Sequence, residues 1–235
     1  MIYLQSLDNR PINFDTASLM YAAIEQDLLY KLITFEELDN YREELKSNLF
    51  CGTVEFLTKA FSLIGLNDVG LKENSNRKSE IITLQEAKER ANKGEFLFIK
   101  PLKIKLFSGF VLGNFIYSEI EKLPDDTLIR AYKPFSERIS SEWRVYIYNH
   151  KVYFSGNYSG DFEVIPDYGY VREVIEKNRN SFPISYTIDV GILESGENVV
   201  VEYNDMWATG NYGVPNDMYL RMIRDRYFQI VRNNI

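Results

Sequence analysis

The chain has 235 residues, of which 45% are hydrophobic and 26% are charged. This composition predicts a folded globular protein and argues against general disorder. Its 34 acidic and 27 basic residues give a formal net charge of −7, which argues against broad electrostatic binding to nucleic acid. No apolar run approaches the roughly 18–20 residues of a membrane span, and the first residues lack the basic and apolar stretches of a signal peptide. We therefore expect a cytoplasmic protein without a membrane partner.

The residue types that build most catalytic dyads and zinc sites are almost absent. The chain has a single cysteine, Cys51, and a single histidine, His150. These numbers exclude an intramolecular disulfide framework and a site with several cysteine or histidine ligands. Their wide separation along the chain argues against a Cys–His catalytic pair. Chemistry in this chain has to use carboxylates, lysines, arginines and amides.

Short apolar segments alternate with amphipathic ones at the start of the chain. We expect a helix capped by Asp15, with Met20, Ala23, Ile24 and Leu28 on one face. The expected order is a strand at 2–7, that helix, a strand at 29–34, a helix at 35–46 and a strand at 48–51. A β-α-β-α-β order is typical of a small parallel sheet.

The middle of the chain is expected to hold two helices and a buried strand. The capping box Thr83-x-x-Glu86 marks the start of the second helix. In order, we expect a helix from Thr53 to Gly65, a polar linker at 67–79, the helix from Thr83 to Gly94 and a strand at 96–100.

From Thr127 onward the pattern changes to antiparallel strands. The expected elements are strands at 143–148 and 152–158 joined by a turn at 149–151, a helix at 168–177, strands at 186–193 and 198–204, and a helix at 216–231. We therefore predict an α+β (mixed α/β) fold with parts at 1–52, 53–125 and 126–235.

A hairpin is expected at residues 186–205. Ser195-Gly196 is a plausible two-residue turn, because glycine supplies the positive φ that such turns require. Counting outward from this turn pairs Leu193 with Asn198 and Asp189 with Glu202. Two carboxylates in direct opposition repel each other unless a cation lies between them.

Asn204 joins this pair, because alternation places it on the same face as Glu202. Oxygen ligands without histidine or cysteine suit Mg²⁺ or Mn²⁺ better than zinc. The hairpin therefore indicates a metal site. The alternative is a solvated strand face on which charges fall at matched positions by chance.

Lys100 ends an apolar strand before a flexible segment. That is a suitable place for an ammonium group that binds phosphate. Lys103 and Lys105 add positive charge, and Ser108-Gly109 offers backbone N–H groups. The alternative is a strand-terminal lysine that reaches solvent. The patterns of a P-loop and of a Rossmann dinucleotide site are both missing.

Glu142 and Arg144 are expected to share one face of a strand. They indicate either part of a site or a surface ion pair. Tyr158 and Tyr212 are equally open between lining a substrate pocket and simple packing.

Together, Lys100-Pro101, Glu142-Trp143-Arg144, and Asp189 followed thirteen residues later by Glu202-Tyr203-Asn204 resemble the ATP-grasp superfamily. Their order and spacing are similar to those of D-alanine–D-alanine ligase. The Glu-Trp-Arg motif is more similar to a clade of small bacterial and phage ATP-grasp proteins. The resemblance implies an ATP-grasp fold, with a short Rossmann-like N-terminal lobe and an antiparallel β C-terminal lobe.

The resemblance also implies roles around the phosphates of ATP. Asp189, Glu202 and Asn204 would hold the Mg²⁺ ions that bridge the phosphates. Lys100 and Lys59 would contact the phosphates directly.

Further positions follow from the same resemblance. Glu142 would accept hydrogen bonds from the ribose hydroxyls, and the hinge that includes Tyr132, Lys133 and Phe135 would bind adenine through its backbone. Arg144 would lie over the reacting carboxylate or acyl phosphate. A loop that includes Lys105 and Ser108 would cover the phosphates.

The implied activity is that of an ATP-dependent carboxylate–amine ligase that works through an acyl phosphate, with ATP and Mg²⁺ between two lobes. Its substrates would be a small carboxylate and an amine, including an amino acid, a peptide or a protein terminus. The alternatives are an ATP-grasp phosphotransferase, a nucleotide-binding pseudoenzyme and a Mg²⁺-dependent restriction-type nuclease.

Overall fold

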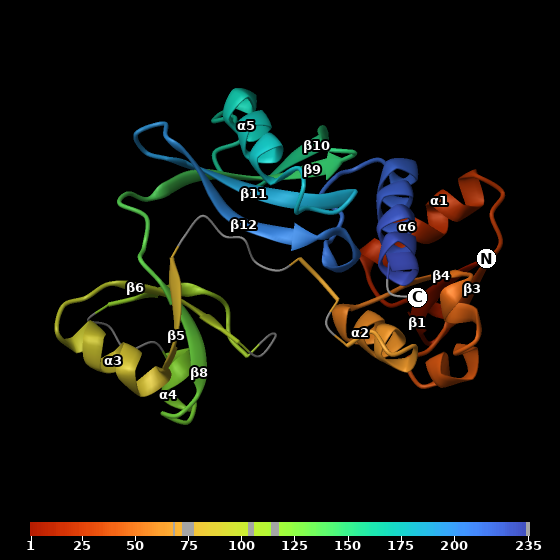
Figure 1. Ribbon diagram of the computed structural model, residues 1–235, viewed down its shortest axis with the longest axis horizontal. Coiled ribbons are helices and arrows are strands. Elements are labelled where there is room, and N and C mark those ends of the chain that lie inside the picture. Colours follow the sequence, from red (N-terminus) through yellow and green to blue (C-terminus); the bar gives the residue numbers. More distant parts are fainter. Residues whose placement is uncertain (68, 72–77, 103–105, 114–117, 234–235) are drawn as a thin grey trace. The chain divides into compact units, whose positions relative to one another are not determined.

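A computed structural model describes residues 1–67, 69–71, 78–102, 106–113 and 118–233 of the chain (Figure 1). The chain divides into two units. The first joins Met1–Asn74 to Ile139–Ile235, and the second is Ser75–Arg138. No helix within the described ranges is both long and apolar enough to cross a membrane.

The first unit begins with the predicted small parallel sheet. Strand β1 (Ile2–Leu7) lies between β3 (Tyr30–Ile33) and β4 (Leu49–Cys51) and runs parallel to both, while β2 (Arg10–Pro11) pairs antiparallel with its end. Cys51 is buried. Helix α2 (Val54–Leu63) follows and is capped by Thr53 as predicted.

Two details of this region differ from the prediction. Helix α1 (Phe14–Glu25) is capped by Asn13 rather than Asp15, because the Asn13 side chain accepts from the Thr16 N–H at 3.0 Å and Thr16 caps it in return. The segment after β3 forms two short 3₁₀ turns, η1 (Glu37–Tyr41) and η2 (Glu44–Lys46), in place of the expected helix.

The predicted apolar face of α1 is also wrong. The helix buries Leu19, Ala22 and Ala23, whereas the side chain of Ile24 is half exposed and that of Leu28 is also exposed. An apolar side chain is buried only when a neighbouring element covers it, and the periodicity of one helix does not show which face that element covers.

The last helix completes the core of the N-terminal part. Helix α6 (Asn216–Asn233) packs on α1, and the Tyr227 hydroxyl donates to the Leu45 carbonyl at 2.8 Å. Phe61 of α2 contacts the Tyr227 ring, with ring centroids 5.4 Å apart. Segments from opposite ends of the sequence therefore share one hydrophobic cluster.

The larger sheet of this unit is antiparallel, with the order β10-β9-β11-β12. Its strands are β9 (Ile139–Tyr148), β10 (Lys151–Gly160), β11 (Ser185–Leu193) and β12 (Asn198–Asp205). Helix α5 (Tyr168–Asn178) packs on the face that carries Val145, Ile147, Ile188 and Val190. Because side chains alternate along a strand, Arg144 and Asp189 lie on the other face.

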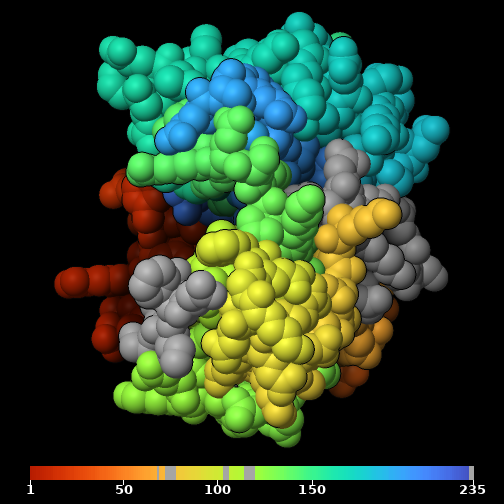
Figure 2. Space-filling model, turned by 90° about the vertical axis from the view of Figure 1, so that its left-hand side faces the viewer, coloured from red at the N-terminus to blue at the C-terminus, as the bar shows by residue number. Residues whose placement is uncertain are grey.

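The second unit is a four-stranded antiparallel sheet with the order β5-β8-β6-β7. Its elements are β5 (Ser79–Thr83), α3 (Leu84–Asn92), β6 (Leu97–Pro101), β7 (Phe110–Leu112), α4 (Ser118–Glu121) and β8 (Leu128–Tyr132). Helix α3 buries Leu84, Ala87 and Ala91 and turns its polar side outward, where it forms the yellow surface in Figure 2. Strand β5 is missing from the prediction, which placed a linker there.

Candidate active site

The hairpin of β11 and β12 places Asp189 opposite Glu202, as predicted. Its turn differs from the prediction. The Leu193 N–H donates to the Glu197 carbonyl, so the loop has three residues and ends at Gly196 with φ 88°, a common hairpin form. This shifts the pairing by one, so that Asn198 lies opposite Ile192 rather than Leu193. A bulge after Asp189 then restores the predicted pair.

Three polar side chains of the hairpin meet on one face of the sheet. The Asn204 Nδ2 atom lies 3.3 Å from Asp189 Oδ2 and 3.3 Å from Glu202 Oε1. The Asp189 side chain is 1% exposed and that of Glu202 is 32% exposed. One carboxylate is therefore fully buried and the other reaches partly to solvent.

Arg144 of β9 is the direct partner of Asp189, which it faces across the sheet. Its Nε donates to Asp189 Oδ1 at 2.8 Å, and its Nη2 donates to Oδ2 at 2.6 Å. The same Nη2 is 4.0 Å from Glu202 Oε1. The cluster thus holds one positive and two negative charges and has a surplus of negative charge.

The titration of Asp189 reflects this environment. Burial raises the pKa of its carboxyl group to about 6, Arg144 lowers it in part, and the charge of Glu202 raises it. For Arg144, burial lowers the pKa, but the hydrogen bond and charge of Asp189 outweigh burial and keep the guanidinium charged. A buried carboxylate with an elevated pKa is stabilised by any further cation beside it.

The donor set fits Mg²⁺. Within the described ranges, no three histidine, cysteine, aspartate or glutamate side chains gather in one place, so a metal here would use Asn204 as the third donor. Two carboxylates and an amide oxygen are hard ligands of the kind that Mg²⁺ prefers. The amide turns its oxygen toward a cation by a simple flip. Asp189, Glu202 and Asn204 would hold the ion.

Two tyrosine rings flank the Arg144 guanidinium. Its central carbon lies 4.8 Å from the Tyr212 ring centroid and 5.4 Å from that of Tyr158. Burial, Asp189 and a hydrogen bond to Glu142 raise the pKa of Tyr158, so its hydroxyl stays protonated and bonds to the Glu142 carboxylate. Tyr158 and Tyr212 therefore belong to the candidate site.

The segment that carries Tyr212 is fixed by side chains from distant elements. The Tyr146 hydroxyl donates to the Gly210 carbonyl at 2.6 Å and accepts from the Tyr212 N–H at 3.0 Å. Asp15 of α1 accepts from the Asn211 N–H at 2.7 Å. No local pattern in the sequence indicates these contacts, because they join residues more than sixty positions apart.

In the second unit, Lys100 lies on the face of β6 opposite the face covered by α3. Lys100 pairs with Arg130 and Phe98 pairs with Tyr132 across β6 and β8, so these four side chains share that face. The Lys100 ammonium is 5.7 Å from the Phe98 ring centroid. Lys100 is thus at a strand end, as predicted, and its phosphate contact stays a prediction.

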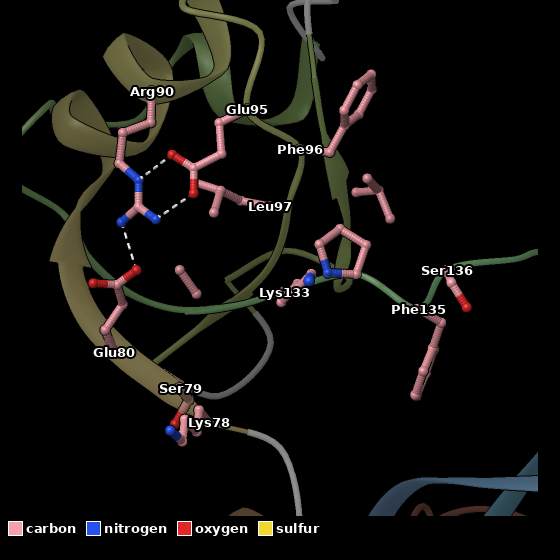
Figure 3. A pocket seen from close by; sticks show the side chains of 13 residues that line it. Lys78, Ser79, Glu80, Arg90, Glu95, Phe96, Leu97, Lys133, Phe135 and Ser136 are labelled. Carbon is pink, nitrogen blue, oxygen red and sulfur yellow. Dashed lines mark hydrogen bonds and ion pairs between the residues drawn. The ribbon is translucent and has the colours of Figure 1, made fainter.

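The largest described pocket of this unit, of about 960 Å³, lies where β8 ends (Figure 3). It includes Lys133 and Phe135 of the predicted adenine hinge, but Tyr132 does not line it. On one side Arg90 donates to Glu95 through two nitrogens and to Glu80 through a third, while Phe96 and Phe135 lie on the other side. Sequence inspection missed the Glu80–Arg90–Glu95 cluster, whose members lie on three different elements.

The remaining predicted positions lie apart from these two groups. The Lys59 ammonium is paired with Asp39 at 2.5 Å and donates to the Phe35 carbonyl at 3.3 Å, and among the described residues no recorded contact joins it to the Asp189 cluster. Ser108 lies between β6 and β7 and is exposed. Lys103 and Lys105 lie outside the described residues.

Comparison with known proteins identifies the family. The model of an ATP-grasp domain, the second family of its clade, matches residues 75–222, which is more than half of the chain. The chain belongs to this ATP-grasp family. A search of curated proteins gives no match.

Solved ATP-grasp structures share the fold of the chain. D-alanine–D-alanine ligase from Bacillus anthracis has 11% sequence identity and a TM-score of 0.58, over 100% of this chain and 98% of its own. A RimK domain ATP-grasp protein from Sphaerobacter thermophilus has 12% identity and a TM-score of 0.60, over 98% of both chains. The ATP-grasp ligase PsnB, complexed with minimal precursor, Mg and ADP, has 12% identity and a TM-score of 0.53, over 96% of both chains. The predicted α+β ATP-grasp fold is confirmed.

Proposed function

We propose that the protein is an ATP-dependent ligase that joins a carboxylate to an amine. Membership of the ATP-grasp family supports ATP-dependent ligase activity in general. The observation that carries the proposal is the cluster of Asp189, Glu202 and Asn204 beside Arg144, because it offers magnesium ligands and a fixed cation on one face of a sheet. PsnB, of the same fold, was solved with Mg and ADP.

In the proposed reaction, a substrate carboxylate oxygen attacks the γ-phosphorus of ATP, and the bond to the β-phosphate oxygen breaks. ADP leaves and an acyl phosphate remains. The amine nitrogen then attacks the acyl carbon, phosphate leaves with the C–O bonding electrons, and the nitrogen loses a proton. Bound magnesium would neutralise charge on the transferring phosphoryl group.

The side chains of the chain supply positioning and charge. Arg144 would stabilise the negative charge that develops on the carboxyl and phosphoryl oxygens. Lys100 would contact the nucleotide phosphates, and Lys133 and Phe135 would present the hinge backbone to adenine. Glu142 would receive the ribose hydroxyls in exchange for its bond to the Tyr158 hydroxyl.

The substrate classes follow from the size of a single arginine-based site. Arg144 suits one carboxylate group, so we propose an amino acid, a peptide or a protein terminus as the substrate. Detection of an amide product rather than a phosphoester separates a ligase from a phosphotransferase. The nuclease hypothesis has no support from the family match.

The first experiment measures thermal unfolding with ADP, with and without Mg²⁺. Ligand at a hundred times its Kd stabilises a folded protein by about 2.7 kcal/mol, which is a shift of a few degrees for a chain of this size. Glu202→Gln removes one proposed ligand and should abolish most of the Mg²⁺-dependent part. Glu197→Gln, an exposed glutamate at the turn of the same hairpin, is the matched control. A wild-type protein that no nucleotide stabilises would contradict the proposal.

A further inference from the structure

Both oxygens of the Asp189 carboxylate are already used by hydrogen-bond donors. Oδ1 accepts from Arg144 Nε, and Oδ2 accepts from both Arg144 Nη2 and Asn204 Nδ2. A carboxylate oxygen has about two lone-pair sites. Oδ2, the oxygen that faces Asn204 and Glu202, therefore has no lone pair left for a metal ion.

A metal at this position has to remove both donors from Oδ2. Asn204 can do so by rotating its amide, which replaces the N–H with an oxygen ligand. The Arg144 guanidinium has no such option, because all its polar atoms are donors and it stays charged. A divalent ion bonded to Oδ2 at 2.0–2.6 Å would also repel a guanidinium nitrogen bonded to the same oxygen.

We propose that Arg144 and magnesium compete for the Asp189 carboxylate, so that the guanidinium is the resident cation of the metal-free site and leaves Oδ2 when the metal binds. This inference rests on the magnesium site of the proposed function. The displaced guanidinium keeps a second attraction, because the Tyr158 and Tyr212 rings lie over it at 5.4 and 4.8 Å. Metal loading thereby frees Arg144 for the substrate carboxylate.

The same unit contains a matched control. Arg226 binds Asp205 with the same geometry, Nε to Oδ1 at 2.8 Å and Nη2 to Oδ2 at 2.6 Å. Both partners are as buried as the first pair. Within the part of the chain that the structure describes, no second carboxylate is recorded against this pair, and the remaining Arg226 nitrogen donates to the neutral Gln229 at 3.0 Å.

The test titrates Mn²⁺ alone, without nucleotide, into the full chain and follows free Mn²⁺ by electron paramagnetic resonance. Arg144→Met should bind Mn²⁺ at least about tenfold more tightly than wild type, because no guanidinium has to be displaced and the buried carboxylate lacks a cation. Arg226→Met should bind it as wild type does. An Arg144→Met protein that binds Mn²⁺ no more tightly than wild type would overturn the inference.

A second measurement avoids the risk that Arg144→Met fails to fold. In wild-type protein labelled with ¹⁵N-arginine, Mg²⁺ should shift or broaden the Nε–H signal of Arg144 and leave that of Arg226 unchanged, with Arg144→Lys and Arg226→Lys providing the assignments. Two unmoved signals at saturating Mg²⁺ contradict the competition. If instead Mg²⁺ and ADP together fail to stabilise the wild type, the proposed function itself is at fault.

Discussion

Two arginine–aspartate pairs of the first unit have the same geometry and different surroundings. Arg144–Asp189 and Arg226–Asp205 are both bidentate, with matching distances of 2.8 and 2.6 Å. The Arg226 pair has no net charge and fastens α6 to the end of β12. The Arg144 pair lies beside Glu202 and therefore carries surplus negative charge. The comparison shows that the charge around an ion pair, more than the pair itself, distinguishes a binding site from a structural contact.

The largest effect is expected from breaking the structural pair. Arg226→Met leaves the buried Asp205 carboxylate without a partner, which should cost about 3–5 kcal/mol of unfolding free energy. Urea unfolding measures this loss. Mg²⁺ and ADP should add the same stabilisation to the variant as to wild type, because the pair lies outside the proposed metal site.

The double variant Arg226→Met with Asp205→Leu is the control for this prediction. It removes both charges and should recover most of the lost stability, since a buried pair is replaced by apolar groups at little net cost. A double variant as unstable as the single one would show that the pair has a function besides neutralising Asp205.

The two pairs also show how far the sequence can be interpreted. Alternation along β9 and the hairpin count correctly place Arg144 on a polar strand face and Asp189 opposite Glu202. The hairpin pair is correct although the turn is wrong, because the three-residue loop shifts the register by one and the bulge after Asp189 shifts it back. Local patterns thus identify the face of a strand more reliably than its register.

What the sequence does not show is which faces meet. The Arg144–Asp189 bond requires β9 beside β11, a pairing between residues 45 positions apart. The Lys59–Asp39 bond and the exposure of Ile24 on α1 are likewise decided by tertiary packing. The lysine positions and the hinge were carried over from a family resemblance, and their contacts with nucleotide remain predictions.

The loop beside Arg144 is the next point at which to test the comparison. Tyr146→Phe removes the hydroxyl that bonds the Gly210 carbonyl and the Tyr212 N–H. Because Tyr146 is fully buried, the loss should cost about 1–3 kcal/mol, measured by urea unfolding. Tyr148→Phe, which loses a bond to Asp225 in a more exposed position, should cost less. Equal losses would mean that the loop does not depend on Tyr146.

A smaller effect is expected from the aromatic ring over the guanidinium. Tyr212→Leu removes the closer of the two rings, and cation–π attraction at a site that is partly exposed is worth about 0.5–1 kcal/mol. Tyr21→Leu, on the exposed face of α1, is a control for removing a surface ring. Equal changes in unfolding free energy for the two variants would show that the Tyr212 ring does not hold Arg144.

The smallest effect, and the one of opposite sign, is expected at Glu202. Without metal, its charge repels Asp189 and raises the pKa of that carboxyl group. Glu202→Gln should therefore stabilise the metal-free protein by about 0.2–1 kcal/mol, the range for like charges on adjacent strands, while weakening the response to Mg²⁺ and ADP. Such a gain is expected where a site keeps a charge for binding rather than for stability. Paired urea unfolding curves, with and without Mg²⁺ and ADP, test both signs at once, and a metal-free loss of stability would show that Glu202 supports the fold rather than the site.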